Sequence, residues 1–363
     1  MSNVKLIILM PSYNKDLYIK KSIESVLNQK TNFNFKLVVT DDGSVDKTIE
    51  IVSSYVERYP NKVVLLPSER NQGLLSNIIK AYDYLLSNES EYFCCLDADD
   101  FLTDMNFYQK AVDFLNTNEK FNIYTSNTSI MFDNGQIYIQ NPHIKDTFID
   151  STFEDMLNDE AVLGNTVSSV FRNCVLNEDL LKKLKQYVGD CYSEVSVRED
   201  DFRNRIHLEN SKAHYVNEVV GTYRVTTRGL YQGSNALKKV LLKIRSFIDM
   251  YYFFDKKYPR FMDLALSHFK RINNEALQFN MNNMLSYPLE DINQLCFIFQ
   301  KLSSYNRDQI EQYISDIKNN EYFCRINNCA ASMAGLKKEK ILLKEFLETV
   351  FSIKNEALDH HLF

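Results

Sequence analysis

Several features that mark common protein classes are missing from this 363-residue sequence. It has no tryptophan, only 9 glycines and 6 prolines, and no apolar run close to the roughly 20 residues needed to cross a bilayer. No GxGxxG follows its first predicted strand and no GxxxxGK[ST] occurs, which excludes ordinary dinucleotide-binding dehydrogenases and P-loop NTPases. The first ten residues lack the cleavage region of a secretory signal, so we expect a cytoplasmic protein.

The charge and the cysteines exclude further classes. A net charge of −6 and a pI near 5.6 give no sign of the basic face that a nucleic-acid partner requires. The 7 cysteines are odd in number and form no CxxC pair, and the 6 histidines are scattered except for one adjacent pair near the end. This pattern predicts reduced thiols and no zinc site.

The first third of the chain alternates strand and helix patterns. Short apolar runs are each followed by a segment with apolar residues at helical spacing. Such alternation predicts a parallel sheet with right-handed crossovers and helices on both faces. The predicted strands are Val4–Met10, Phe35–Thr40, Val63–Leu66 and Tyr92–Leu96.

The pattern changes near Phe121 and again near Ser234. A hairpin is predicted at Asp133-Asn134-Gly135, with later strands at Val167–Phe171 and Tyr215–Arg224. Beyond Ser234 every segment has helical spacing. We therefore expect an α/β domain over 1–233, in two halves of about 1–120 and 121–233, and a helical domain over 234–363.

Polar clusters follow the predicted strands, where parallel sheets bind ligands. Tyr13 could stack on a base or simply pack at a strand end. Asp42 could accept a hydrogen bond from a base or cap a helix, with Ser44 as the N-cap of the next helix. Asp97 and Asp99 are hard oxygen donors suited to Mg²⁺ or Mn²⁺, unless they form a solvated turn. DADDFLTD is not an EF-hand loop, since its Gly and closing Glu are missing.

Four motifs, MPSYN (10–14), VVTDDGSVDKT (38–48), ERNQGL (69–74) and CLDADD (95–100), together resemble family two inverting glycosyltransferases. Weaker similarity continues through VREDDF (197–202) and GTYRVTTRG (221–229). The resemblance implies a GT-A fold, a mostly parallel α/β sheet. It also implies metal-dependent sugar transfer from a nucleotide sugar, with UDP favoured. The implied acceptor is a glycan or a lipid-linked molecule in surface-polysaccharide or lipo-oligosaccharide synthesis.

The resemblance also assigns roles within the donor site. Asp99 would ligate Mn²⁺ or Mg²⁺ at the donor diphosphate, Tyr13 would stack on the base, and Asp42 would bind the base edge. Asp97 would contact the ribose or share the metal's shell. The full implied set of nucleotide-sugar-binding residues is Pro11, Tyr13, Asn14, Asp42, Asp97 and Ala98.

The resemblance implies a general base in the Glu199-Asp200 pair, and we assign it to Asp200. An acidic residue also suits a helix N-terminus, and Asp201 follows directly. Arg224 and Arg228 are candidates to assist the leaving diphosphate. The segment GNTVSSVFR (164–172) resembles the family's acceptor-facing region, so Asn165, Thr166 and Ser168 could hydrogen-bond sugar hydroxyls or be ordinary polar groups of a loop and strand.

The tail and the competing functions leave alternatives open. Lys238, Lys239, Lys243 and Arg245 lie opposite an apolar helical stripe, which suits peripheral contact with the inner face of a membrane or a solvated surface. The tail is also a candidate for homodimerisation. A non-catalytic sugar-nucleotide-binding or scaffold protein is one alternative function. A sugar-1-phosphate nucleotidyltransferase is another, although MPSYNKD lacks the Gly-rich, Arg-containing loop it needs. The missing tryptophan of QxxRW and the lack of membrane spans argue against processive synthesis.

Overall fold

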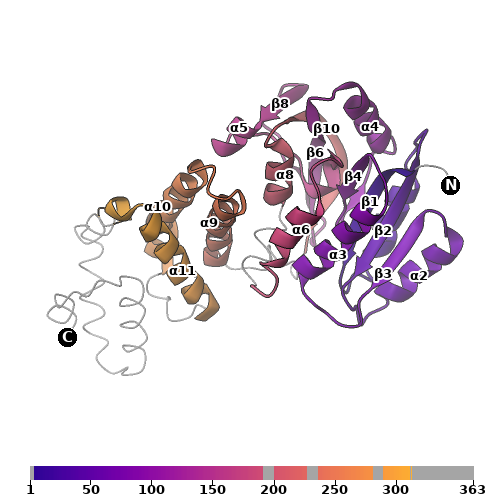
Figure 1. Cartoon of the computed structure of the whole chain (residues 1–363). Helices are drawn as coiled ribbons and strands as arrows, with labels where there is room; N and C mark the ends of the chain where they lie inside the picture. Colours follow the sequence, from indigo (N-terminus) through magenta and orange to yellow (C-terminus); the bar gives the residue numbers. More distant parts are fainter. Residues whose placement is uncertain (1–3, 191–199, 227–235, 281–288, 311, 313–363) are drawn as a thin grey trace. The chain divides into compact units, whose positions relative to one another are not determined.

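The computed structural model describes residues 4–190, 200–226, 236–280, 289–310 and 312 (Figure 1). The chain divides into two compact units, Met1–Gly233 and Ser234–Phe363. The distal part of the predicted helical domain, in which Leu343, Phe346, Leu347 and Val350 have the spacing of an apolar helical stripe, lies outside the described residues.

The first half of the first unit alternates strands and helices, as the sequence predicts. Four strands alternate with three helices, and a two-residue strand and a fourth helix follow. The elements are β1 (Val4–Ser12), α1 (Ile19–Leu27), β2 (Asn34–Asp41), α2 (Thr48–Arg58), β3 (Val63–Pro67), α3 (Leu74–Ser87), β4 (Tyr92–Cys95), β5 (Phe101–Leu102) and α4 (Phe107–Thr117).

The second half adds longer strands and short helices. They are β6 (Phe121–Phe132), β7 (Ile137–Ile139), β8 (Phe148–Thr152), α5 (Phe153–Leu157), the 3-10 helix η1 (Thr166–Ser168), β9 (Ser169–Arg172), α6 (Glu178–Lys185), α8 (Asp200–Leu208) and β10 (Lys212–Val225). The predicted hairpin is confirmed: β6 and β7 pair antiparallel, with Gly135 in the turn at a φ of 84°.

All these strands join one sheet. Its order is β3-β2-β1-β4-β9-β6-β10-β5, with β7 paired to β6 and β8 paired to β10. β3, β2, β1 and β4 run parallel, so their carboxyl ends share one edge. The short strand β5 pairs antiparallel with β10 directly after the acidic cluster. The sheet therefore gathers the four motifs at one rim.

Helices cover both faces of the parallel part of the sheet (Figure 1). Leu6, Ile8 and Met10 of β1 pack into the main hydrophobic cluster with side chains of α1, α2 and α4. The alternate residues Ile7 and Leu9 are buried as well, and α3 contacts β1 and β2. Burial on both faces explains why β1 contains a continuous apolar run, Leu6–Met10, rather than an alternating pattern.

The described part of the second unit is helical, with α9 (Ala236–Phe253), α10 (Arg260–Asn280) and α11 (Leu289–Tyr305). Its predicted apolar stripe is buried at Leu241, Ile244, Phe247 and Ile248. Arg245 is buried too, and its Nε donates to Oδ1 of Asp249 at 2.8 Å. The prediction of a basic surface that includes Arg245 is therefore wrong. This side chain is buried, forms an ion pair with Asp249 within α9 and donates to Gln294 of α11.

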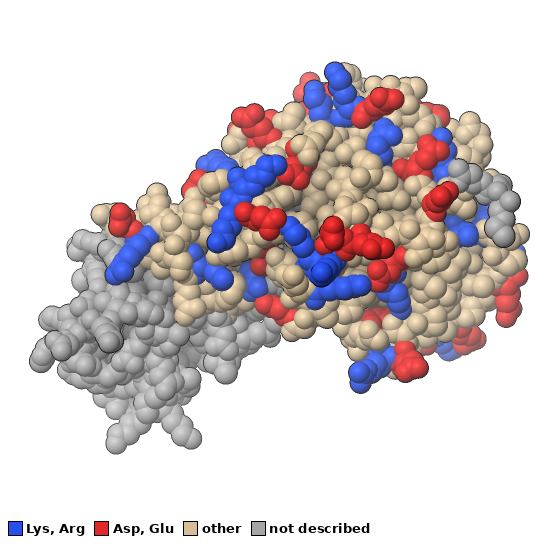
Figure 2. Space-filling view, in the orientation of Figure 1, with Lys and Arg blue, Asp and Glu red and all other residues tan. Residues whose placement is uncertain are grey.

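Two surface properties bear on the expected partners. None of the described helices is both long and apolar enough to span a membrane. On the face shown in Figure 2, basic and acidic side chains are interspersed rather than gathered into one basic area. That face lacks the continuous positive surface of a nucleic-acid-binding protein.

Candidate functional site

The loops that follow β1 and β2 are bound to each other. The backbone N–H of Asn14 donates to Oγ of Ser44 at 2.8 Å, and Oδ1 of Asn14 accepts from the N–H of Val45 at 2.9 Å. Asn14 has a φ of 52°, in the left-handed region that Asn tolerates better than most residues. Asn14 therefore fixes the two loops together, in addition to any contact with a ligand.

Ser44 does not cap the helix that follows it, which corrects the prediction. α2 begins at Thr48, four residues later, and Lys47 is its N-cap. The Ser44 hydroxyl instead donates to Oδ2 of Asp41 at 2.6 Å while it accepts from Asn14. The hydroxyl is thus used between loops, where it holds the rim in shape.

Tyr13 and Pro11 differ in their access to a ligand. Pro11 is buried and pairs with Thr40 inside the sheet. Tyr13 is 43% exposed at the tip of the loop. An aromatic ring at the carboxyl rim of a parallel sheet, open to solvent and carried by an anchored loop, offers a face on which a planar base can stack.

Asp42 anchors the loop before α3. Its Oδ1 accepts from the N–H of Gln72 at 2.8 Å and its Oδ2 from that of Gly73 at 3.1 Å. Burial raises the pKa of Asp42 above its ordinary value, although these two hydrogen bonds oppose the shift. Asp42 therefore holds the loop before α3 and caps neither α2 nor α3, which corrects the helix-cap prediction, and contact with a base edge remains a prediction.

Gly43 lets the β2 loop approach its neighbour closely. It has a φ of 72°, and a Cβ there would lie 2.5 Å from the carbonyl carbon of Arg70. Any other residue would push the loop away from 70–73. Gly43 therefore keeps Asp42 within reach of the two N–H groups that it binds.

The acidic cluster after β4 contains three carboxylates in different environments. Asp97 and Asp99 are partly exposed, whereas Asp100 is 1% exposed. Burial, reinforced by the charges of Asp97 and Asp99, raises the pKa of Asp100 well above its ordinary value. Its Oδ1 accepts from the N–H of Arg224 at 2.8 Å. Asp100 is therefore a structural member of the cluster, and Asp97 and Asp99 are the members open to a ligand.

Lys15 is the site residue that sequence reasoning missed. Its ammonium forms an ion pair with Oδ2 of Asp99. In the sequence, Lys15 stands directly after the motif MPSYN. This position does not indicate a role by itself, because the contact with Asp99 exists only once β1 pairs with β4. The ion pair supplies positive charge at an otherwise acidic position.

The carboxylates fit a divalent cation that is shared with a phosphate ligand. Within the described residues, no three acidic, His or Cys side chains lie together as a metal site. A Mg²⁺ or Mn²⁺ ion completed by substrate phosphates needs only one or two protein carboxylates, which Asp99 and Asp97 can provide. Lys15 on Asp99 shows that a cation is accommodated at this oxygen.

Ala98 lies between these carboxylates but is itself 1% exposed and packs in the main core. Its carbonyl accepts from Oγ of Ser22 at 2.8 Å. A contact between Ala98 and a nucleotide would therefore involve its backbone.

Arg224 lies beside the acidic cluster and faces aromatic rings. Its guanidinium carbon is 5.0 Å from the ring centroids of both Tyr18 and Phe101. This placement keeps positive charge close to Asp100 at the rim. Arg228, the other candidate, lies outside the described residues.

Asp200 is the first residue of α8, and the side chains of Asp200 and Asp201 lie outside what the structure describes. The helix itself is well anchored. Nη2 of Arg203 donates to Oγ1 of Thr166 at 3.2 Å. His207 is fully buried, and its ring lies 5.5 Å from that of Phe93 in β4 and 4.9 Å from that of Phe171 in β9. The helix that begins at Asp200 and the strand that leads to Asp97 thus share one core.

The segment predicted to face an acceptor is partly internal. Ser168 is fully buried, and its Oγ donates to the carbonyl of Ser126 at 2.8 Å, so the prediction of an acceptor contact is wrong for this residue. Asn165 and Thr166 are half-buried. Oδ1 of Asn165 accepts from Nε2 of Gln140 at 3.3 Å. Of the three predicted residues, Asn165 and Thr166 therefore remain candidates for contact with an acceptor.

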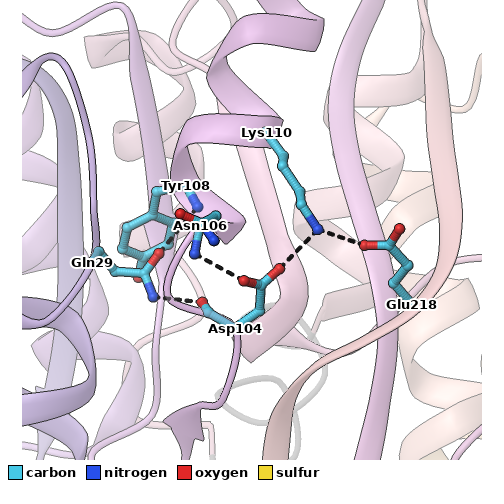
Figure 3. Close-up of polar contacts among 6 residues, drawn as sticks. All are labelled: Gln29, Asp104, Asn106, Tyr108, Lys110 and Glu218. Atoms are coloured by element: carbon cyan, nitrogen blue, oxygen red, sulfur yellow. Dashed lines mark hydrogen bonds and ion pairs between the residues drawn. The ribbon is translucent and has the colours of Figure 1, made fainter.

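A polar network fixes the segment just beyond the acidic cluster (Figure 3). Nζ of Lys110 bridges Asp104 at 3.0 Å and Glu218 of β10 at 2.7 Å. Gln29 donates to the carbonyl of Asp104 at 2.7 Å and accepts from the N–H of Tyr108 at 3.1 Å. The segment 97–104 is therefore held by α4 and β10 as well as by β4.

Comparison with known proteins agrees with this geometry. Residues 7–184 match the model of glycosyl transferase family 2. The minor teichoic acid biosynthesis protein GgaA of Bacillus subtilis is 38% identical over 125 residues, which is 32% of this chain and 26% of GgaA. GgaB of the same organism is 36% identical over 107 residues, 29% of this chain and 11% of GgaB. The chain thus spans only a minor part of these two relatives.

Solved structures share the fold. S. aureus TarS 1–349 in complex with UDP-GlcNAc superposes with a TM-score of 0.54 at 18% identity, covering 82% of each chain. The complex of the same protein with UDP gives 0.55 at 16% identity, covering 85% of this chain and 83% of TarS 1–349. Together with the family match, this likeness confirms the predicted α/β fold of GT-A type.

Proposed function

Residues 7–184 form a glycosyl transferase family 2 domain, and from this premise we propose that the protein transfers a sugar from a UDP-sugar to a glycan or lipid-linked acceptor of a bacterial surface polysaccharide. The observation that carries the proposal is one rim on which exposed Tyr13 and the carboxylates of Asp97 and Asp99 follow neighbouring parallel strands. A stacking ring and hard oxygen donors together suit a nucleoside diphosphate with a divalent cation.

The choice of donor and acceptor class draws on the relatives. TarS 1–349 was solved with UDP and with UDP-GlcNAc, which supports uracil as the base here. GgaA and GgaB are named for minor teichoic acid biosynthesis, which supports a surface glycan as the acceptor. The reaction would then take place in the cytoplasm or at the inner face of the membrane.

The proposed chemistry is a single inverting displacement. The carboxylate of Asp200 takes the proton of the acceptor hydroxyl as its oxygen forms a bond to the anomeric carbon. The bond from that carbon to the β-phosphate oxygen breaks, and UDP leaves with the electron pair. A Mn²⁺ or Mg²⁺ ion held by Asp99, with Asp97 nearby, would supply the positive charge that stabilises the departing diphosphate. Arg224 is a candidate for further positive charge, since its backbone N–H binds Asp100 while its guanidinium lies over the rings of Tyr18 and Phe101.

A ligand screen tests the proposal. The thermal midpoint of the full chain is measured with UDP-, GDP-, dTDP- and CMP-sugars, each with Mn²⁺ and with EDTA. A ligand at a hundredfold excess over its Kd stabilises the folded state by about 2.7 kcal/mol. We expect stabilisation by UDP-sugars with Mn²⁺, and its loss in Asp99→Ala. No stabilisation by any nucleotide would reject the donor site. Binding without turnover on any glycan acceptor would favour the scaffold alternative.

A further inference from the structure

Lys15 occupies a position in the donor site to which neither the motifs nor the comparisons give a role. It follows β1 directly after Asn14, and its ammonium is paired with Oδ2 of Asp99 from the loop after β4. The pair is partly shielded, since the Lys15 side chain is 26% exposed and that of Asp99 is 14% exposed. The partner of Lys15 is thus the carboxylate proposed to hold the metal.

The backbone of Lys15 is held on both sides, so only its side chain is free to move. Its N–H donates to Oγ1 of Thr48 at 2.7 Å. Its carbonyl accepts from the N–H groups of Tyr18 and Ile19, each at 2.9 Å, in the turn that leads into α1. A lysine side chain of four methylenes can move its ammonium by several ångströms from such a fixed point.

Neighbouring cations are directed elsewhere. The ammonium of Lys21 lies 3.4 Å from the ring centroid of Phe101, and the guanidinium of Arg224 faces the same ring at 5.0 Å. Lys15, in contrast, is in direct contact with a carboxylate, and its charge also acts on Asp100. Lys15 therefore neutralises part of the acidic cluster when no other cation does so.

We propose that Lys15 is a donor-site residue with two positions. Without a divalent cation it pairs with Asp99, and with a cation and donor bound it contacts the β-phosphate of the nucleoside diphosphate. The proposal rests on the function proposed above. It assigns Lys15 as a residue that both competes with the metal and binds the donor.

The physical reason is competition for one oxygen. An ammonium and a divalent cation repel each other and cannot share Oδ2 of Asp99. When the cation binds there, the Lys15 ammonium must leave, and the diphosphate that arrives with the cation is the nearest new anion. Binding of the metal alone therefore breaks the ion pair between Lys15 and Asp99. When the diphosphate binds with the metal, Lys15 gains a new ion pair with the β-phosphate in its place. This makes the two ligands bind cooperatively, and the coupling must be equal in both directions.

Binding measurements on the full chain with Lys15→Met test the proposal. Isothermal titration gives the affinity for Mn²⁺ alone, and for UDP and UMP at saturating Mn²⁺. We expect Lys15→Met to bind Mn²⁺ alone about three- to tenfold more tightly, because the competing ion pair is gone. We expect UDP to bind about tenfold more weakly, and UMP, which lacks the β-phosphate, to change less than twofold.

Two further variants control for folding and for general charge. Lys20→Met removes an exposed lysine of α1 and should leave all three affinities unchanged. Lys15→Arg keeps the positive charge, so its affinity for Mn²⁺ alone should stay as weak as that of the wild type. Equal Mn²⁺ affinity in the wild type and Lys15→Met would overturn the competition. Equal weakening of UDP and UMP would overturn the β-phosphate contact.

The failure of this inference is distinguishable from that of the proposed function. If the wild type binds no UDP at saturating Mn²⁺, the proposed function fails, and the β-phosphate position fails with it. If the wild type binds UDP and Lys15→Met behaves like the wild type in every titration, the function stands and the role of Lys15 is wrong.

Discussion

The backbone N–H of Arg224 donates a 2.8 Å hydrogen bond to Oδ1 of Asp100. This bond joins the buried end of the acidic cluster to β10, next to the pairing of Phe101 with Thr222. The loop that carries Asp97 and Asp99 is therefore fixed from two strands that are far apart in sequence. Preorganised carboxylates need not be ordered when a ligand binds, which favours affinity.

Substitutions of Asp100 separate its charge from its role as an acceptor. Asp100→Asn keeps an oxygen for Arg224 and removes a buried charge close to two others, so we expect little loss of stability or a gain. Asp100→Ala leaves the N–H of Arg224 without its acceptor and should lower the free energy of unfolding by about 1–3 kcal/mol. Urea denaturation of both variants measures this. Equal losses in the two would mean that the carboxylate charge, rather than the acceptor, stabilises the loop.

Ser44→Ala tests whether the tied loops prepare the rim for a nucleotide. The substitution removes the hydrogen bonds to Asp41 and from Asn14, and should cost about 1–2 kcal/mol, mostly in local order. We expect UDP to bind about tenfold more weakly, because the loop that carries Tyr13 loses its anchor. The matched control is Ser54→Ala, whose hydroxyl donates only to the carbonyl of Ile51 on the exposed side of α2. A normal UDP affinity in Ser44→Ala would show that donor binding does not depend on this tie.

His207 makes stability depend on pH. Burial lowers the pKa of His207 to about 4, from an ordinary value of 6.5. The unfolded chain therefore takes up a proton below pH 6.5 that the folded chain refuses until about pH 4. Stability is full above pH 6.5 and falls as the pH drops through this window, by about 2 kcal/mol between pH 7.5 and pH 5 for this group.

The measurement compares the wild type with His207→Gln. Denaturant unfolding at pH 7.5 and pH 5 gives the difference for each protein. We expect His207→Gln to be less stable at pH 7.5, since it disturbs the packing against Phe93 and Phe171, but to lose about 2 kcal/mol less on acidification. The same pH dependence in both proteins would mean that His207 is not buried in its neutral form.

The sequence allowed the layered part of the fold to be predicted because local pattern and tertiary packing agree there. Leu6–Met10 is apolar throughout, and it is buried on both faces of the sheet. The acidic cluster was found because three carboxylates after an apolar strand are unusual in any context. The roles of Tyr13 and Asp99 are implied by the motif resemblance and stay predictions, and the fold brings their loops to one rim.

The misses depend on neighbours that are distant in sequence. Lys15 became a site residue only because β1 pairs with β4, which puts it against Asp99. Arg245 has the spacing of a surface residue, but Asp249 and Gln294 neutralise and bind it inside the helical unit. Ser168 is polar, yet the carbonyl of Ser126 satisfies it in the core. In each case a partner supplied by tertiary structure decides whether the polar group faces solvent.

A comparison of the Asp200→Asn and Asp201→Asn variants tests which residue is the general base. Asp200 and Asp201 are the first two residues of α8, and successive positions of a helix lie about 100° apart around its axis, so the two single substitutions distinguish which residue is the base. We expect Asp200→Asn to slow transfer by about 10²–10⁴-fold, since an amide cannot take the acceptor's proton. The affinity for UDP should stay within about twofold, because the base does not contact the nucleotide. Single-turnover rates and UDP titrations separate the two effects. A slow Asp201→Asn beside a normal Asp200→Asn would move the base by one position, and normal rates in both would place it on another element.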